Sequence, residues 1–290
     1  MTATGPLRSH PRVDAHVHLS RWWPDVHRTA YRPDLKYDVA GLLSEMDRNG
    51  IDYALTIQLF LAPTEEEAAA EGRSAFETSG GRLLPVATVD PTKGADAVAR
   101  ILERLEKETP LYGVKLFPGY LPFYPDDPRA APIYEFAHHR RIPVLIHQGD
   151  TLQGRGLIRF ARPLEVDEIA GRYRDVQFVL CHLGNPWIDE AAEMVYKNPN
   201  VYTDTAGLLP HPSAPYFEAA VERAREQVQG AIVMTGAPER FLFGSDWPLE
   251  ELELAVDMIE SLRLKAEDVA RILGGNAAKL LGIDPTPTEA

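Results

Sequence analysis

Two histidines separated by one residue stand in the stretch RVDAHVHLS, which covers residues 12–20. Its Val, Ala and Leu residues are typical of a buried β-strand. Side chains alternate between the two faces of a strand, so His16 and His18 point to the same side. Two adjacent uncharged imidazoles gain little by packing together, whereas they are good ligands for one metal ion. The pair therefore predicts a metal site on this strand.

Further residues with chemically useful side chains lie near the carboxyl ends of later strand-like runs. These residues are Lys115, His147, His182 and Asp246. In a parallel barrel the carboxyl ends of all strands meet at one face, so side chains from distant parts of the chain would converge there. Imidazole nitrogens and carboxylate oxygens are ligands that zinc, manganese and iron accept. We therefore expect a divalent metal centre at that face.

Short apolar runs alternate with amphipathic segments along the whole chain. The predicted strands cover 12–20, 52–59, 83–90, 111–118, 143–150, 176–184, 201–207 and 241–248. The predicted helices cover 39–49, 64–79, 94–108, 130–140, 165–174, 188–197, 214–229 and 251–263. Alternation of this kind indicates parallel strands with crossover helices, and eight such units close into an α/β fold, a single (β/α)8 TIM barrel. An open doubly wound sheet is the alternative, but no glycine-rich phosphate-binding turn follows the first strand.

One barrel domain is expected over residues 11–283, with flexible tails at 1–10 and 284–290. The formal net charge of −13 argues against nucleic acid or an anionic membrane as the main partner. The first ten residues lack the apolar run of a signal peptide, and a single cysteine suits a reducing compartment, so we expect a cytoplasmic protein. The sequence leaves the oligomeric state open, including a homodimer.

The sequence resembles the amidohydrolase superfamily, and within it the amidohydrolase-related (amidohydrolase 2) group of hydrolases and decarboxylases. The resemblance extends over nearly the whole chain and rests on six motifs: DAHVHLS, GVKLFP, VLIHQGDT, LCHLGN, LFGSDWP and ILGGNAAKLLGI. It implies four metal ligands, which are His16, His18, His147 and Asp246. It also implies that Asp246 accepts a proton from a water on the metal, and that His182 either binds a second metal or handles a proton.

Lys115 bears on the number of metal ions. In relatives with two metals, a lysine on the fourth strand is carboxylated and bridges them, and Lys115 stands where that lysine would be. We expect one ion, with zinc favoured over manganese or iron. Lys115 is then a substrate contact, or a ligand of a second ion if it is carboxylated.

The loops after the strands suggest how a substrate is held. Aromatic walls with a few polar anchors are typical of small-molecule sites, and Trp22, Tyr120 and Trp247 lie beside the expected centre. Arg155 could bind a substrate carboxylate with two hydrogen bonds. We therefore expect a small anionic substrate.

Three functions are compatible with these residues. The first is hydrolysis of an amide, ester or lactone by metal-activated water in a small carboxylated molecule. The alternative is non-oxidative decarboxylation of an aromatic or unsaturated acid. A metal-binding barrel without catalysis is the third, and it predicts a mouth filled by side chains.

Overall fold

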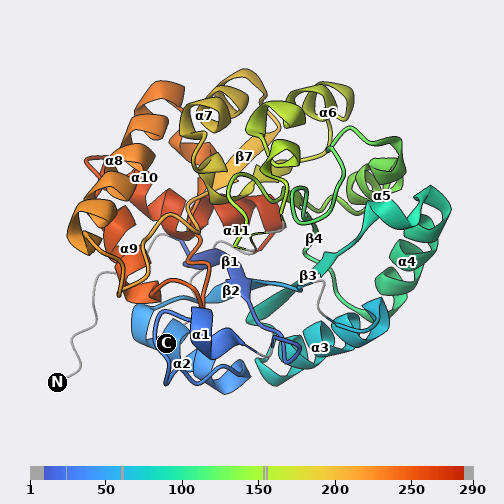
Figure 1. Cartoon of the computed structure of the whole chain (residues 1–290), viewed down its shortest axis with the longest axis horizontal. Helices are drawn as coiled ribbons and strands as arrows, with labels where there is room; N and C mark the ends of the chain where they lie inside the picture. The colour runs from blue at the N-terminus through green and yellow to red at the C-terminus, as the bar shows by residue number, and fades with distance from the viewer. Residues whose placement is uncertain (1–9, 24, 60–61, 153, 155, 284–290) are drawn as a thin grey trace.

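Eight parallel strands form the barrel in the computed structural model, which describes residues 10–23, 25–59, 62–152, 154 and 156–283 (Figure 1). The strands pair in chain order from β1 to β8. They are β1 (Val13–His18), β2 (Tyr53–Ile57), β3 (Leu83–Thr88), β4 (Gly113–Leu116), β5 (Val144–Ile146), β6 (Phe178–Leu180), β7 (Val201–Asp204) and β8 (Phe241–Leu242). The predicted (β/α)8 barrel is confirmed. The tails expected at 1–10 and 284–290 lie outside the described residues, apart from His10.

Most of the helices surround the strands on the outside of the barrel (Figure 1). They are α1 (Val26–Thr29), α2 (Val39–Asn49), α3 (Glu65–Thr78), α4 (Ala95–Glu108), α5 (Ala131–Arg140), α6 (Asp167–Arg172), α7 (Ile188–Lys197), α8 (Phe217–Thr235), α9 (Leu252–Glu260), α10 (Ala266–Ala270) and α11 (Asn276–Leu281). In α4 the buried residues Val98, Ile101, Leu102 and Leu105 follow the helical period, so one stripe faces the strands.

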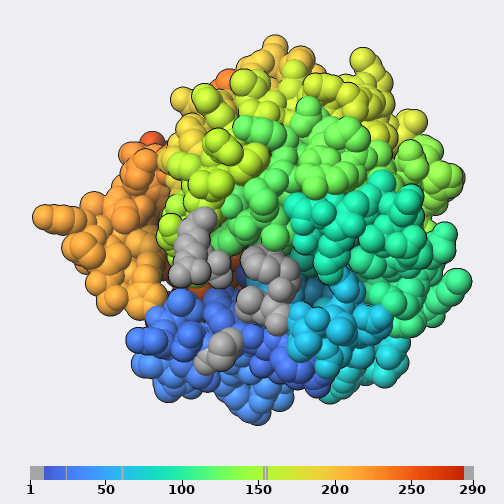
Figure 2. Space-filling view, turned by 45° about the vertical axis from the view of Figure 1, so that its right-hand side comes forward, coloured from blue at the N-terminus to red at the C-terminus, as the bar shows by residue number. Residues whose placement is uncertain are grey.

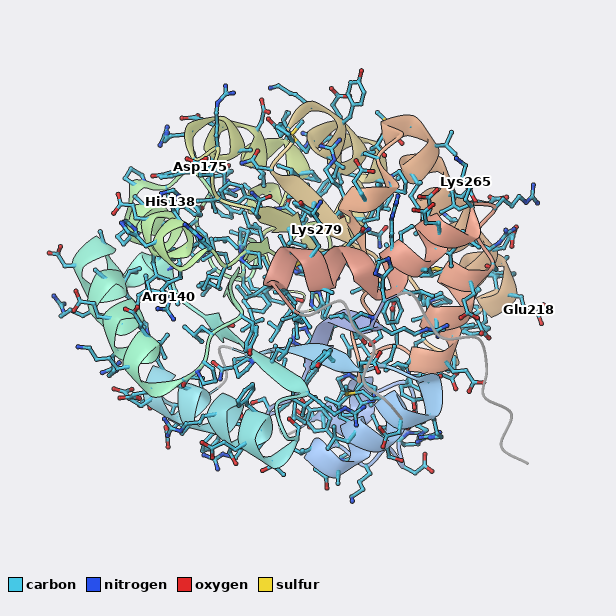
Figure 3. All side chains as sticks on the ribbon, turned by 180° about the vertical axis from the view of Figure 1, so that it is seen from behind. His138, Arg140, Asp175, Glu218, Lys265 and Lys279 are labelled. Atoms are coloured by element: carbon cyan, nitrogen blue, oxygen red, sulfur yellow. The ribbon has the colours of Figure 1, made fainter. Side chains whose placement is uncertain are left out.

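Charged and polar side chains lie around the outside of the barrel. His138, Arg140, Asp175, Glu218 and Lys265 lie around the periphery, as Figure 3 shows from behind. No described helix combines the length and the apolar character that crossing a membrane requires.

The barrel closes through the segment that follows β8. The backbone N–H of Ala15 donates to the Phe243 carbonyl at 2.8 Å, and the N–H of His18 donates to the Trp247 carbonyl at 2.7 Å. Between these bonds, the N–H of Asp246 donates to the His16 carbonyl at 2.8 Å. Closure of the barrel therefore places Asp246 beside the histidine pair of β1.

The opposite, amino-terminal end of the barrel is covered by the last helical segment. Helix α11 crosses this end in the view from behind (Figure 3). Just before it, a Cβ atom on Gly274 would lie 2.0 Å from the Pro11 carbonyl oxygen, so the backbone here comes close to the start of β1. The two glycines of the motif ILGGN therefore allow close packing at this end of the barrel. The predicted site residues lie at the opposite end.

Candidate metal centre

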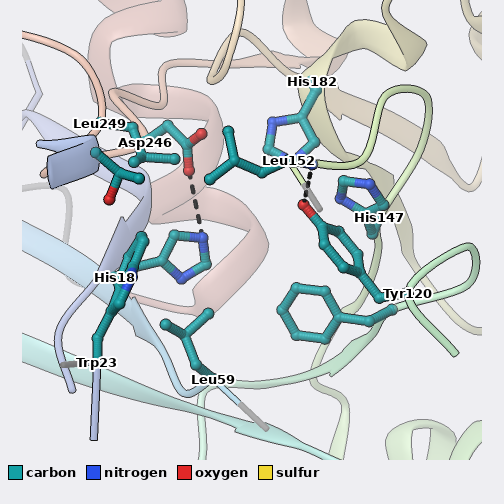
Figure 4. A pocket seen from close by; sticks show the side chains of 11 residues that line it. His18, Trp23, Leu59, Tyr120, His147, Leu152, His182, Asp246 and Leu249 are labelled. Carbon is teal, nitrogen blue, oxygen red and sulfur yellow. Dashed lines mark hydrogen bonds and ion pairs between the residues drawn. The ribbon is translucent and has the colours of Figure 1, made fainter. Parts of the chain in front are cut away.

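A cavity of about 270 Å³ opens at the carboxyl ends of the strands (Figure 4). Figure 2 shows the surface hollowed between the blue amino-terminal segment and the green segment from the middle of the chain. The cavity is lined by His18, Trp23, Thr29, Leu59, Phe117, Tyr120, His147, Leu152, His182, Asp246 and Leu249. The space thus lies directly over the predicted metal ligands.

The histidines and the aspartate predicted at the strand ends gather around one place. Nε2 of His18 lies 3.3 Å from Oδ1 of Asp246, and Nε2 of His16 lies 3.6 Å from the same oxygen. The ring of His182 is centred 4.7 Å from that of His16 and 5.0 Å from that of His147. Donor atoms of His16, His182 and Asp246 all lie within 4.8 Å of one another. The structure therefore brings together residues from β1 and from the ends of β5, β6 and β8.

Each of the four imidazoles uses one ring nitrogen to contact an oxygen atom. The N···O distances are 2.8 to 3.2 Å, and the partners are the Asp204 carboxyl group for His16 and the backbone carbonyls of Ile57 for His18, Asp150 for His147 and Ala206 for His182. A carbonyl or an ionised carboxylate only accepts hydrogen bonds, so beside such a partner the contacting nitrogen carries the proton, and in the neutral ring the other nitrogen carries a lone pair. These second nitrogens are the atoms that could bind a metal.

The electrostatics of the cluster favour neutral imidazoles and an ionised aspartate. Burial lowers the pKa of His16, His147 and His182, because it disfavours the charged ring. Burial raises the pKa of Asp246, but its contacts with His18, His16 and His182 outweigh this and leave the pKa below its ordinary value. The site thus combines lone-pair nitrogens with a carboxylate.

Two orphaned atoms show that this arrangement fits a cation. Within the part of the chain that the structure describes, Nε2 of His16 and Oδ1 of Asp246 are buried and have no hydrogen-bond partner. Leaving buried polar atoms unsatisfied costs free energy, and an imidazole nitrogen and a carboxylate oxygen are both metal ligands. A divalent ion held by these residues would satisfy both atoms.

Asp204 supports the centre and is missing from the site residues predicted from sequence. It lies at the end of β7 with no exposed surface. One carboxylate oxygen contacts Nδ1 of His16 at 2.8 Å, and the other accepts from the backbone N–H of His182 at 2.7 Å. The second bond holds His182 at φ 63°, a left-handed conformation uncommon outside glycine. A charged residue ending an apolar strand is the signal that could have identified it.

Replacing Asp204 by asparagine should weaken metal binding about 10- to 100-fold, because the partner that orients a metal-binding imidazole tunes its affinity. Titration calorimetry with Mn²⁺ or Zn²⁺ would measure this change. Asp175→Asn is the matched control, since Asp175 is exposed at the periphery (Figure 3). Unchanged affinity in Asp204→Asn would show that Asp204 does not orient a ligand.

Lys115 is enclosed within the barrel and is separated from the cavity. Its side chain is fully buried, its Nζ lies 2.8 Å from Sγ of Cys181, and it is not among the residues that line the cavity. The predicted direct contact between Lys115 and a substrate therefore has no support in this geometry.

The residues predicted to contact a substrate have different outcomes. Tyr120 lines the cavity, and its hydroxyl accepts a hydrogen bond from the backbone N–H of Leu152 at 2.8 Å. Trp22 does not line the cavity, but the next residue, Trp23, does. Trp247 is fully buried, stacks on Tyr37 at 5.3 Å between ring centres and does not line the cavity. Arg155 lies outside the described residues.

Comparison with solved structures identifies the fold. An uncharacterized TIM-barrel protein from Bordetella bronchiseptica aligns with a TM-score of 0.73 and 20% identity over 94% of this chain and 99% of that one. A 5-carboxyvanillate decarboxylase from Novosphingobium aromaticivorans, complexed with manganese and 4-hydroxy-3-methoxy-5-nitrobenzoic acid, aligns with a TM-score of 0.69 and 17% identity over 97% and 99%. A probable 2-pyrone-4,6-dicarboxylic acid hydrolase from Acinetobacter baumannii, with citric acid bound, aligns with a TM-score of 0.67 and 18% identity over 93% and 99%.

The sequence comparison is more specific. No curated protein matches the chain significantly. The histidine and aspartate side chains gathered at the site are suited to a divalent metal ion. The solved decarboxylase holds manganese, so the expectation that zinc is the ion is not confirmed. The family model described as Amidohydrolase (Amidohydro_2) matches residues 13–283. Because this match spans nearly the whole chain, the protein belongs to the Amidohydrolase family, as its sequence motifs predicted.

Proposed function

We propose that the protein is a metal-dependent, non-oxidative decarboxylase of a small aromatic or unsaturated carboxylic acid. The observation that carries this proposal is the make-up of the cavity. Trp23, Leu59, Phe117 and Leu152 form apolar walls beside the imidazoles and Asp246, and none of the described residues that line the cavity is a lysine or arginine. Decarboxylation turns a charged carboxylate into neutral carbon dioxide, and apolar surroundings favour the uncharged product.

The bound ion would supply positive charge that holds the oxygen atoms of the substrate at the floor of the cavity. Aromatic side chains such as Phe117 and Tyr120 would orient the flat acid between them. Because the metal ligands contribute one negative side chain, Asp246, an anionic substrate suits the loaded site.

His182 is the residue we assign to proton transfer. The carbon that loses carbon dioxide must gain a proton, while the electron pair of the broken C–C bond stays on that carbon. Asp246 has a lowered pKa and is a poor proton donor. His182 lines the cavity, its Nδ1 is occupied by the Ala206 carbonyl, and its other nitrogen can carry the transferred proton. An anionic substrate beside the ring favours the protonated form.

The test is a substrate panel assayed in parallel for carbon dioxide release and for acid release. Protein loaded with Mn²⁺ or Zn²⁺ would be incubated with aromatic and unsaturated carboxylic acids and, separately, with pyrones and other lactones. We expect carbon dioxide from an acid without added oxidant, and one deuterium at the vacated carbon when the reaction runs in D₂O. Ring opening without carbon dioxide release would contradict decarboxylation.

Hydrolysis, the first function expected from the sequence, becomes the second candidate. The likeness to a probable 2-pyrone-4,6-dicarboxylic acid hydrolase favours a lactone as the substrate class. Asp246 would then take a proton from the attacking water, and His182 would stabilise the developing oxyanion. The non-catalytic barrel has less support, since it requires a mouth filled by side chains and a cavity of about 270 Å³ lies there.

A further inference from the structure

Glu250 is a buried carboxyl group beside the centre that the proposed chemistry does not use. It is 4% exposed, lies four residues after Asp246 and does not line the cavity. We propose that Glu250 is a positioning residue, which sets the orientation of His182 by holding the loop after β7, residues 205–209. This inference rests on the proposed proton-transfer role of His182.

Glu250 binds the backbone of that loop. The N–H of Leu209 donates to Oε1 of Glu250 at 2.5 Å, and the N–H of Gly207 also donates to this carboxyl group. The other oxygen, Oε2, is buried and has no hydrogen-bond partner among the described residues. Glu250 therefore ties the loop after β7 to the segment after β8, which carries Asp246.

The held loop packs directly against His182. The carbonyl of Ala206 contacts Nδ1 of His182 at 3.1 Å and so fixes the tautomer of the ring. Gly207 has φ +70°, and a Cβ atom there would lie 2.5 Å from Nδ1 of His182 and 3.3 Å from Oδ2 of Asp246. Gly207 therefore lets the loop backbone approach both side chains closely. Movement of residues 206–207 would displace the acceptor that orients His182.

The oxygen atoms of Glu250 provide the means of testing this role. Burial and the nearby Asp246 raise the pKa of Glu250 well above its ordinary value. A carboxyl group accepts hydrogen bonds through an oxygen atom whether it is ionised or protonated. Glutamine keeps that oxygen and the length of the side chain, whereas alanine removes the acceptor.

The experiment compares Glu250→Ala, Glu250→Gln and a control, Glu45→Ala. Glu45 is also buried, at 5% exposure. It lies on α2 and forms ion pairs with Arg48 of the same helix and with Arg32, which precedes the helix. Three properties would be measured: hydrogen exchange of the Gly207 and Leu209 amides, the tautomer of His182 from ¹⁵N shifts of histidine-labelled protein, and kcat and KM for an acid that the protein decarboxylates.

In Glu250→Ala we expect faster exchange of both amides and loss of the single Nδ1–H tautomer of His182. We also expect a fall in kcat of about 10- to 100-fold with little change in KM, since small misplacements of a reacting group have effects of this size. Glu250→Gln should restore all three properties. Glu45→Ala should lower thermal stability and leave all three unchanged.

Two outcomes would overturn the positioning role. One is an unchanged His182 tautomer and kcat in Glu250→Ala despite faster exchange of the loop amides. The other is a Glu250→Gln variant as impaired as Glu250→Ala. If the wild-type protein decarboxylates no acid in the panel, the proposed function fails, and the exchange and tautomer measurements still decide whether Glu250 positions His182.

Discussion

Replacing His16 by alanine should remove the bound metal and lower kcat/KM by at least about 10³-fold, because a catalytic ion supplies several kcal/mol of stabilisation and each 1.36 kcal/mol changes a rate tenfold. His16 has no exposed surface, and its Nε2 is buried beside Asp246 without a hydrogen-bond partner among the described residues. Without this nitrogen, the cluster loses the ligand that lies nearest its buried end. Elemental analysis of protein purified without chelators would measure metal per chain, and we expect about one ion in the wild-type protein.

His138→Ala is the matched control for this change. His138 is exposed on α5 and lies at the periphery of the barrel (Figure 3), so its loss should leave metal content and activity unaltered. Circular dichroism would establish that His16→Ala retains the helices and strands. Full activity together with unchanged metal content in His16→Ala would refute the metal-dependent mechanism, although not the fold.

The barrel could be predicted from the sequence because hydrophobic periodicity is a local signal. The helices predicted at 39–49 and 188–197 have the same bounds as α2 and α7 in the structure. The predicted strands are longer than the observed ones, and some of the extra residues have left the sheet and lie at the site. Asp246, for example, has φ 54° and stands four residues after the end of β8. A run of apolar residues does not show at which residue the hydrogen bonding between strands ends and a turn begins.

Short helices at the ends of the chain were missed for a related reason. Helices α1, α10 and α11 contain 4, 5 and 6 residues, which is too few to show a helical period. Their positions depend on contacts with distant segments. The approach of Gly274 to the start of β1 is such a contact, and nothing in the neighbouring residues encodes it.

The sequence predicts which residues gather at the candidate site, but not which residues support them. Residue type and strand-end position were sufficient to bring His16, His147, His182 and Asp246 together. Asp204 and Glu250 act through hydrogen bonds to residues far along the chain, and Asp204 is 188 positions from His16. Such pairs depend on side-chain reach within the folded barrel. The sequence predicts Trp22 at the cavity, whereas Trp23 lines it. Side chains in a loop do not alternate regularly, so the sequence does not show which of two neighbours faces the cavity.

Replacing His182 by asparagine should lower kcat by about 10²- to 10⁴-fold, the usual contribution of general acid–base catalysis, while the metal remains bound. This combination separates a proton donor from a metal ligand, because loss of a ligand removes the metal as well as the activity. Burial lowers the pKa of His182 below its ordinary value of about 6.5. A donor acts in its protonated form, so kcat/KM of the wild-type protein should fall as the pH rises through this lowered pKa.

The His182→Asn variant should lose this pH dependence, and it should incorporate deuterium from D₂O no faster than the uncatalysed reaction. Metal content, measured on the same preparation, should stay at the wild-type value. His139→Asn, an exposed change on α5, controls for loss of a histidine elsewhere. If His182→Asn loses its metal together with its activity, His182 is a ligand, and the proton must reach the substrate carbon from a different group.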